Sequence, residues 1–229
     1  MILRDIYLDL DRSNYSTKVA YAFKLGSRCL CHFIGRYIWE KQVRVSGFNR
    51  VSLILAKDAV SGFYVNVCRV ACISLPFDDT AYLSLEGTAL QEFYIDCLLR
   101  GVRCYLSDLP DVLTAIEEGI AKFRLEGYKN EWVAKSRRFG PSQLSAKLIG
   151  CLTIERFSLR LIVHNRKKML YDQEIFSSDP DEIAFAHRFK DIVLEEDKVA
   201  VTSRHGKPLL ELVVADLFQT EDEKPTKGS

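Results

Sequence analysis

The sequence of 229 residues lacks the features of membrane-spanning and secreted chains. No apolar run approaches the roughly 18 positions of a transmembrane helix, because Arg, Asp or Lys interrupts the longest runs every few residues. The start Met1–Asp11 alternates and carries acids, so it has neither the basic region nor the apolar region of a signal peptide. The expected location is the cytoplasm, with no membrane partner.

The sequence also lacks an excess of charge of either sign. It has 32 Lys and Arg against 31 Asp and Glu, for a net charge of +1. A protein that coats nucleic acid or binds membranes through basic residues normally has a strong basic excess, so neither class is expected. With 48% hydrophobic and 28% charged residues, the chain has the composition of a folded protein with a packed core.

Motifs of catalysis and metal binding are missing as well. There is no Gly-x-Ser-x-Gly, no glycine-rich phosphate loop and no Cys-x-x-Cys, and none of the four histidines lies in a known motif. Strand alternation would place His32 on the face opposite to Cys29 and Cys31, which separates this potential zinc cluster. The seven cysteines lie in apolar segments and are interpreted as buried reduced thiols. No metal, no cofactor and no catalytic set is predicted.

The first 75 residues are dominated by alternating patterns that favour half-buried strands. The expected strands form an antiparallel meander and cover residues 18–25, 28–39, 43–45, 51–55 and 63–75.

Helical spacing follows the expected meander. One stripe ends before Gly101, and a short strand is expected at residues 102–106. A second helix should begin at the N-cap Asp108, with Pro110 in its first turn, and end before Gly127. The charged segment 128–142 reads as a linker.

The last third returns to alternation, with a strand over residues 157–163, a turn at 165–168 and a second strand at 169–176. A helix should start at Asp179–Glu182 and extend to about Val193, and two further strands are expected at 199–202 and 209–214. The predicted class is therefore α+β, with largely antiparallel sheets and about three or four helices packed on them. The expected domains are 1–139, the meander with two helices, and 140–218, a β-rich subdomain with one helix or a part of the same fold, followed by a disordered tail, 219–229.

Asp9-x-Asp11 after an apolar strand resembles the first motif of the haloacid dehalogenase-like phosphatases. The resemblance implies Asp9 as nucleophile and Asp11 as acid and base, with Ser107 in the place of the phosphate-binding Ser or Thr and Asp179 with Asp181 as the late acidic pair. It covers four short segments. A metal-dependent phosphohydrolase is therefore one alternative function, and a strand end whose acids begin a turn is the other reading of these residues.

A second alternative is a phosphate or nucleic-acid binder that uses a basic strand face. Alternation projects three side chains to one side of a strand, and a turn adds three cations beside them. The face consists of Arg156, Arg160, His164, Arg166, Lys167 and Lys168.

The favoured function is a non-enzymatic protein-binding module whose partner is another protein, for example an immunity-type inhibitor that occludes a toxin or enzyme. Such a module would use a charged surface and aromatic anchors. The expected binding residues are Asp108, Asp111, Glu117, Glu118 and Trp132. The sequence predicts neither the identity of the partner nor the oligomeric state.

Overall fold

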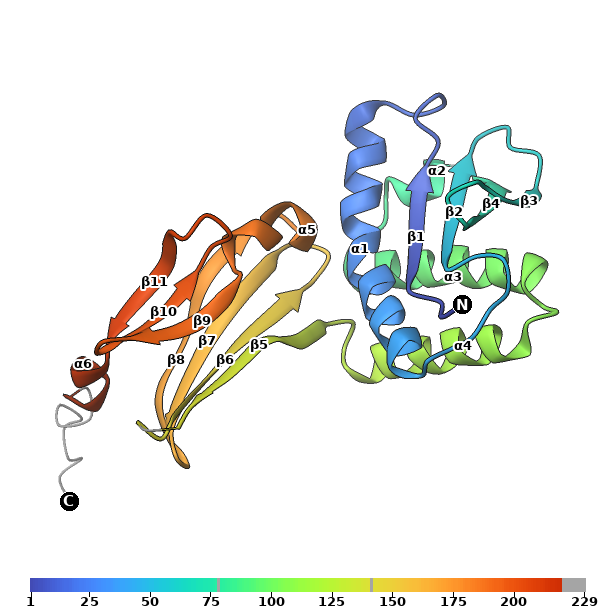
Figure 1. The fold of residues 1–229 in the computed structure, drawn as a ribbon. Helices are drawn as coiled ribbons and strands as arrows, with labels where there is room; N and C mark the ends of the chain where they lie inside the picture. The colour runs from blue at the N-terminus through green and yellow to red at the C-terminus, as the bar shows by residue number, and fades with distance from the viewer. Residues whose placement is uncertain (78, 141, 220–229) are drawn as a thin grey trace, which may run out of the picture. The chain divides into compact units, whose positions relative to one another are not determined.

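The computed structural model describes residues 1–77, 79–140 and 142–219. The chain is α+β with mostly antiparallel sheets, which confirms the predicted class. It divides into two compact units (Figure 1). One comprises Met1–Asn130 with Thr153–Glu155, and the other comprises Glu131–Leu152 and the chain from Arg156 onward. The chain thus passes from the first unit to the second after residue 130, within the strand Asn130–Phe139.

The N-terminal unit is built on a four-stranded mixed sheet with the order β1-β2-β4-β3. β1, β2 and β4 are parallel, and β3 is antiparallel to β4. Leu8 of β1 pairs with Leu53 of β2, which pairs with Ile73 of β4, so that buried side chains of all three strands share one face. The strands are β1 Asp5–Leu10, β2 Arg50–Ala56, β3 Gly62–Val65 and β4 Val70–Pro76.

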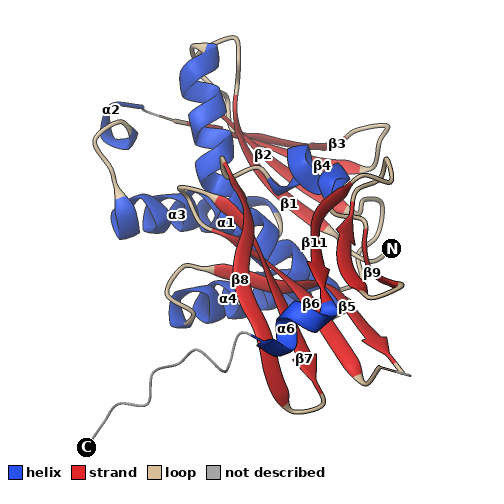
Figure 2. Cartoon of the chain, turned by 90° about the vertical axis from the view of Figure 1, so that its left-hand side faces the viewer, coloured by secondary structure: helices blue, strands red, loops and turns tan. Residues whose placement is uncertain are grey.

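The helices of this unit are α1 Thr17–Glu40, α2 Asp79–Tyr82, α3 Gly87–Tyr105 and α4 Pro110–Leu125. α3 and α4 lie to one side of β1, β2 and β4 (Figure 2). Near its middle α3 contacts α1, where Tyr94 approaches Gly26, and further on Gly101 packs on Leu53 of β2. At the last residue of α3, Tyr105 stacks on Phe63 of β3, with ring centroids 6.3 Å apart. α3 therefore crosses the whole sheet.

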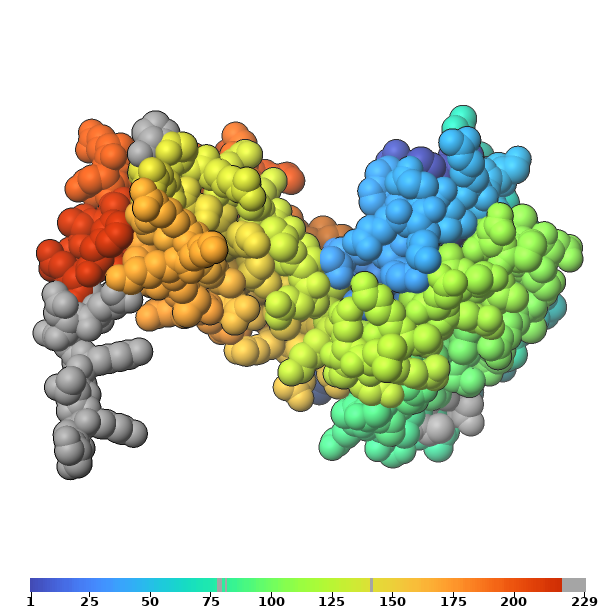
Figure 3. Space-filling model, turned by 90° about the horizontal axis from the view of Figure 1, so that it is seen from below, coloured from blue at the N-terminus to red at the C-terminus, as the bar shows by residue number. Residues whose placement is uncertain are grey.

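Helix α1 runs along the edge of β1 and is buried over most of its length. The Ser27 hydroxyl donates to the Leu8 carbonyl at 3.3 Å, and a Cβ added to Gly35 would lie 3.1 Å from the Arg4 carbonyl oxygen. This close approach of α1 to β1 is possible because Ser27 and Gly35 are small residues. α4 packs beside α1 (Figure 3), with Phe33 and Phe123 in ring contact.

The predicted meander is wrong, because residues 17–40 form α1 instead of two strands and the neighbouring strands are parallel. A helix that is buried on several sides is apolar on several sides, so a period of two can be found in it as easily as a period of 3.6. The Ser16 side chain accepts a hydrogen bond from the Val19 N–H at 3.3 Å, which is the N-cap that marks the helix start.

Three local predictions around α3 and α4 also need correction. Residues 102–106 are not a strand, since α3 continues to Tyr105. The N-cap of α4 is Leu109 and not Asp108, although Pro110 occupies the first turn as predicted. The supposed linker 128–142 contains strand β5, Asn130–Phe139. Gly127, with φ +67°, follows the end of α4 as expected.

The C-terminal unit consists of two antiparallel sheets that lie against each other (Figure 1). One has the order β5-β6-β7-β8 and the other β11-β10-β9. Phe157 and Leu161 of β7 are fully buried between them, with Val199 and Val201 of β10. The remaining elements are β6 Leu144–Leu152, β7 Phe157–Asn165, β8 Lys168–Ser178, α5 Glu182–Phe185, the 3-10 turn Ala186–Arg188, β9 Asp191–Glu195, β10 Lys198–Thr202, β11 Pro208–Val213 and α6 Val214–Gln219.

Alternation predicted four strands of this unit and missed β5, β6 and β9. The strands expected at 157–163, 169–176, 199–202 and 209–214 correspond to β7, β8, β10 and β11. The helix expected from residue 179 starts at the N-cap Asp181 but ends at Phe185, and Val193 belongs to β9. Gln219 ends α6, and the rest of the tail for which disorder was predicted lies outside the described residues.

The crossing of α3 over the sheet can be tested at Gly101. A Cβ there would overlap Leu53 Cδ2 and lie 3.2 Å from Leu75 Cδ1, both in the core. We expect Gly101→Ala to lower the free energy of unfolding by roughly 1–3 kcal/mol, as overpacking does. Gly62→Ala is the matched control, because its Cβ would meet only the Val60 carbonyl at 3.8 Å. Urea unfolding of both variants measures the difference, and equal stability would contradict this packing.

Candidate functional site

The structure separates the predicted acidic binding residues into two groups. Glu117 accepts two hydrogen bonds from Arg103, at 3.1 and 2.7 Å. Glu118 accepts from Tyr37 at 2.9 Å and pairs with Lys41 at 3.0 Å, and these contacts hold the pKa of its carboxyl below the ordinary value. Asp108 and Asp111 are exposed at the turn between α3 and α4. Two of the four acids thus serve contacts within the N-terminal unit.

Trp132 is half-buried in the C-terminal unit and is not an exposed anchor. Its ring stacks on Phe157, with centroids 6.0 Å apart, and lies against Gly150, where an added Cβ would overlap it. The side chain fills space over the sheet that only a glycine leaves open.

The basic strand face exists on β7, but acids of β8 lie opposite its arginines. Arg156 pairs with Glu174 at 3.2 Å, and Arg160 pairs with Asp172 at 3.5 Å. The Arg166 guanidinium, in the turn between β7 and β8, donates to Gln143, in the turn between β5 and β6. His164 is half-buried, and Lys167 and Lys168 are exposed. Cross-strand pairing of this kind stabilises a sheet and reduces the positive potential that a phosphate would need.

The four segments of the phosphatase resemblance do not form one cluster. Asp9 and Asp11 lie at β1, at one edge of the N-terminal sheet. Ser107 lies in the turn after α3, which ends at β3 on the opposite edge. Asp179 belongs to the C-terminal unit. Among the described residues, no group of three His, Cys, Asp or Glu side chains could hold a metal ion.

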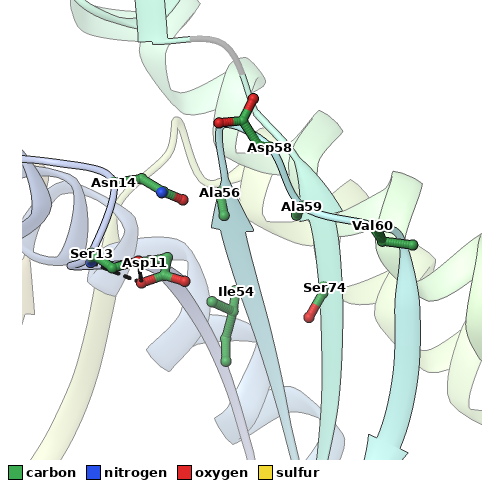
Figure 4. Close-up of a pocket in the computed structure, with 9 residues that line it drawn as sticks. All are labelled: Asp11, Ser13, Asn14, Ile54, Ala56, Asp58, Ala59, Val60 and Ser74. Carbon is green, nitrogen blue, oxygen red and sulfur yellow. Dashed lines mark hydrogen bonds between the residues drawn. The ribbon is translucent and has the colours of Figure 1, made fainter.

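A depression of about 300 Å³ lies where the parallel strands end (Figure 4). Asp11 follows β1, Asp58 lies in the loop after β2, and Ser74 is near the end of β4. Ligands of α/β proteins bind at such carboxyl ends of strands. The lining consists of Asp11, Ser13, Asn14, Ile54, Ala56, Asp58, Ala59, Val60 and Ser74.

The pKa values of Asp9, in β1, and Asp11, directly after β1, are shifted in opposite directions. The Asp11 carboxylate accepts hydrogen bonds from the Ser13 N–H at 2.9 Å and the Ser13 hydroxyl at 2.8 Å, which lower its pKa. Burial raises the pKa of Asp9. The positive charges of Lys24, Arg12 and Arg28 oppose that rise only in part. Asp11 is thus the better anion, and it is the one that lines the depression.

A second candidate site is the outer edge of β3. Each of the three sheets has two edge strands, and an uncovered edge is a template for pairing with another chain. α1 covers β1, and the edge strands of the C-terminal unit, β5, β8, β9 and β11, all carry charged residues. β3 reads Gly-Phe-Tyr-Val and has no charge, no proline and no strand of the described residues on its outer side.

The side chains around β3 are exposed on both faces. Tyr64 is 55% exposed, Val60 in the preceding loop 88% and Val67 in the following turn 100%. Phe63 and Val65 are exposed at 42% each. Clustered exposed apolar residues of this kind mark contact surfaces more often than single ones do.

The backbone of β3 shows which groups point outward. The Asn66 N–H donates to the Val70 carbonyl at 3.0 Å, so Asn66 and Val70 form a hydrogen-bonded pair. Such pairs alternate along an antiparallel ladder. Tyr64 therefore bonds to Cys72 of β4, whereas the N–H and C=O groups of Phe63 and Val65 point to the outer edge.

Sequence reasoning missed this edge because it merged residues 63–75 into one strand. The missed signal is the uncharged segment Val60–Val67 in a chain with 28% charged residues. An edge strand normally carries a charge or a proline that discourages pairing.

The electrostatics of β1 give opposite predictions for two isosteric variants. A raised pKa means that the neutral Asp9 carboxyl is favoured in the fold, and this stabilisation is lost as the pH rises through the raised value. Asp9→Asn should therefore melt above the wild type at pH 7, with a difference that narrows towards pH 4.5.

Asp11→Asn should behave in the opposite way. Its lowered pKa stabilises the fold at every pH above the ordinary value of about 3.9, so the variant should melt below the wild type by a difference that persists from pH 7 to 4.5. Thermal unfolding followed by circular dichroism measures both. Shifts of the same sign in the two variants would contradict the assignment.

Comparisons with protein-family models, with curated proteins and with solved structures found no match. In the part of the chain that the structure describes, no helix has the length and apolar character needed to cross a membrane.

Proposed function

We propose that this chain is a non-enzymatic protein-binding module that pairs an extended segment of its partner with the outer edge of β3. The observation that carries the proposal is that β3 is the uncharged, uncovered edge of a sheet whose other edge is closed by α1. In strand addition, the main-chain hydrogen bonds supply affinity and the flanking side chains supply specificity.

The energetics fit a reversible contact. Phe63 and Val65 together offer two N–H and two C=O groups, and each backbone hydrogen bond contributes about 0.5–1.5 kcal/mol net. A bound strand would also cover the exposed parts of Phe63, Tyr64 and Val65. Since this interface is at the small end of specific contacts, a dissociation constant on the order of micromolar is expected. An inhibitor that covers a toxin or enzyme is one form that such a module takes.

Two proline variants test strand addition at β3. Val65→Pro removes an N–H that points outward, so the fold should keep its melting temperature while binding of an extended partner is lost. Tyr64→Pro removes an N–H that bonds to β4 and leaves a carbonyl of β4 without its donor, so it should destabilise the sheet by about 1–3 kcal/mol.

The readouts are thermal unfolding and capture of partner from a lysate of the native cell at moderate salt. Capture of the same partner by wild type and Val65→Pro at equal efficiency would show that β3 is not the binding edge.

A second candidate function is a metal-dependent phosphohydrolase, and the observation that favours it is the anionic Asp11 in the depression at the strand ends. Here we expect magnesium-dependent release of phosphate from an aryl phosphate, with a loss of at least about 100-fold in Asp11→Asn, since general acid–base groups contribute that much. Asp172→Asn, on the surface of β8, is the control. Release that is no faster than the blank would contradict this candidate.

A further inference from the structure

Two turns of the C-terminal unit bring basic side chains together at one end of its three-stranded sheet. One turn is the segment 186–190, before β9, and the other is the segment 203–207, between β10 and β11. The Arg204 N–H donates to the His187 carbonyl at 2.9 Å, and the rings of His187 and His205 lie 6.4 Å apart between centroids. These contacts join the two turns. The group, called the basic cluster below, consists of His187, Arg188, Lys190, Arg204, His205 and Lys207.

The first turn of the basic cluster is anchored on aromatic rings of the larger sheet. Phe185 contacts Phe176 with ring centroids 5.3 Å apart, and Phe189 contacts Phe157 at 5.9 Å. Between these anchors, the Arg188 guanidinium carbon lies 5.4 Å from the centre of the Phe176 ring and 5.5 Å from that of Phe185. Such cation–π contacts stabilise one position of the guanidinium. None of the described residues accepts a hydrogen bond from its N–H groups.

The lysines and arginines of the basic cluster form no ion pair with a carboxylate of the described residues. All six side chains of the cluster are exposed, and neither of its two segments contains an Asp or Glu. The acids next to the first segment have contacts elsewhere, since Asp191 pairs with Arg137 at 2.5 Å and Asp181 caps α5. In the same unit, Arg156 and Arg160 do face acids. The basic cluster therefore offers N–H donors of four cations that the fold does not use.

Four cations with unused donors in two adjoining turns fit the chemistry of a phosphate group. A phosphomonoester has three strong acceptor oxygens and a charge of about −1.5 to −2 at neutral pH. Guanidinium groups bind such oxygens with two parallel hydrogen bonds. A single strand of nucleic acid would need, in addition, exposed aromatic rings on which its bases stack. The aromatic residues beside the basic cluster, Phe185 and Phe189, pack on Phe176 and Phe157 instead.

We infer that the basic cluster is a binding site for a phosphomonoester, carried by a small molecule or by a phosphorylated side chain of a protein. Arg188, held by its two aromatic rings, supplies one guanidinium, and Arg204 supplies the other from the second turn. The hydrogen bond from the Arg204 N–H to the His187 carbonyl keeps the two turns together before the ligand binds. The site belongs to the C-terminal unit, and it does not depend on strand addition at β3.

The test is a titration of the isotope-labelled full chain with methyl phosphate, followed by the amide signals in heteronuclear NMR spectra at constant ionic strength. We expect saturable shifts in the segments 186–190 and 203–207, with a dissociation constant on the order of millimolar for so small a ligand. Dimethyl phosphate has a similar size but carries a single negative charge. It should therefore bind at least about threefold more weakly than the monoester.

The double variant Arg188→Gln, Arg204→Gln should bind methyl phosphate about three- to tenfold more weakly, as the loss of two exposed charged contacts predicts. Lys147→Gln with Lys167→Gln is the matched control, because it removes two exposed cations of the same unit, in β6 and in the turn between β7 and β8. Its affinity should equal that of the wild type. Arg204→Gln alone should weaken binding about two- to fivefold and keep the melting temperature, since its side chain forms no hydrogen bond or ion pair with the described residues.

A phosphoserine peptide distinguishes the two sources of the phosphate group. If it binds more tightly than methyl phosphate and its unphosphorylated form does not bind, the source is a phosphorylated protein, and equal affinity makes the source a small molecule. Absence of saturation by about 20 mM, shifts outside the two segments, or equal affinity of dimethyl phosphate or of the double variant would overturn the inference. Tighter binding of a single-stranded oligonucleotide or of phosphatidylserine vesicles at the same residues would also overturn it, because an extended polyanion would then be the ligand.

Discussion

The close contact between helix α1 and the backbone of β1 governs the N-terminal unit. Gly35 lets the helix approach the Arg4 carbonyl, and the Ser27 hydroxyl bonds to the Leu8 carbonyl at 3.3 Å. A sheet edge exposes a row of backbone groups that must be paired, covered or hydrated. Because α1 satisfies that requirement at β1, the edge that remains without a partner strand among the described residues is β3.

The position of β3 follows from the parallel pairing of β2 and β4. Parallel neighbours need a connection that returns the chain to its starting end. α1 is that connection between β1 and β2, whereas between β2 and β4 the chain returns as β3, antiparallel to β4. Since β4 takes the place beside β2, the returning strand is left outside. The uncovered edge is thus a consequence of topology, and its apolar sequence is the part that topology does not require.

The sequence predicts a helix or strand well where one face of the element is exposed to solvent and the other is buried. In β7, the fully buried residues Leu159, Leu161 and Val163 alternate with the more exposed residues Arg160, Ile162 and His164, and the predicted strand is correct. In α1, the half-buried polar residues Lys24, Arg28, His32 and Arg36 recur at every fourth position, as in a helix, but the buried residues Cys29, Cys31 and Phe33 alternate as well. The prediction followed this alternation and not the polar stripe. The α+β class survived this error because it rests on the number of elements rather than on their order.

The candidate sites differ in how much of each can be predicted from the sequence. Asp9 and Asp11 are visible as a pair in the sequence, yet burial of one and the Ser13 hydrogen bonds of the other give them opposite pKa shifts, which spacing does not encode. The β3 edge depends on the strand order of the sheet, which residue spacing does not encode. The sequence names the four acids Asp108, Asp111, Glu117 and Glu118 but does not distinguish them. The structure does so, since Glu117 pairs with Arg103 and Glu118 pairs with Lys41, whereas Asp108 and Asp111 are exposed.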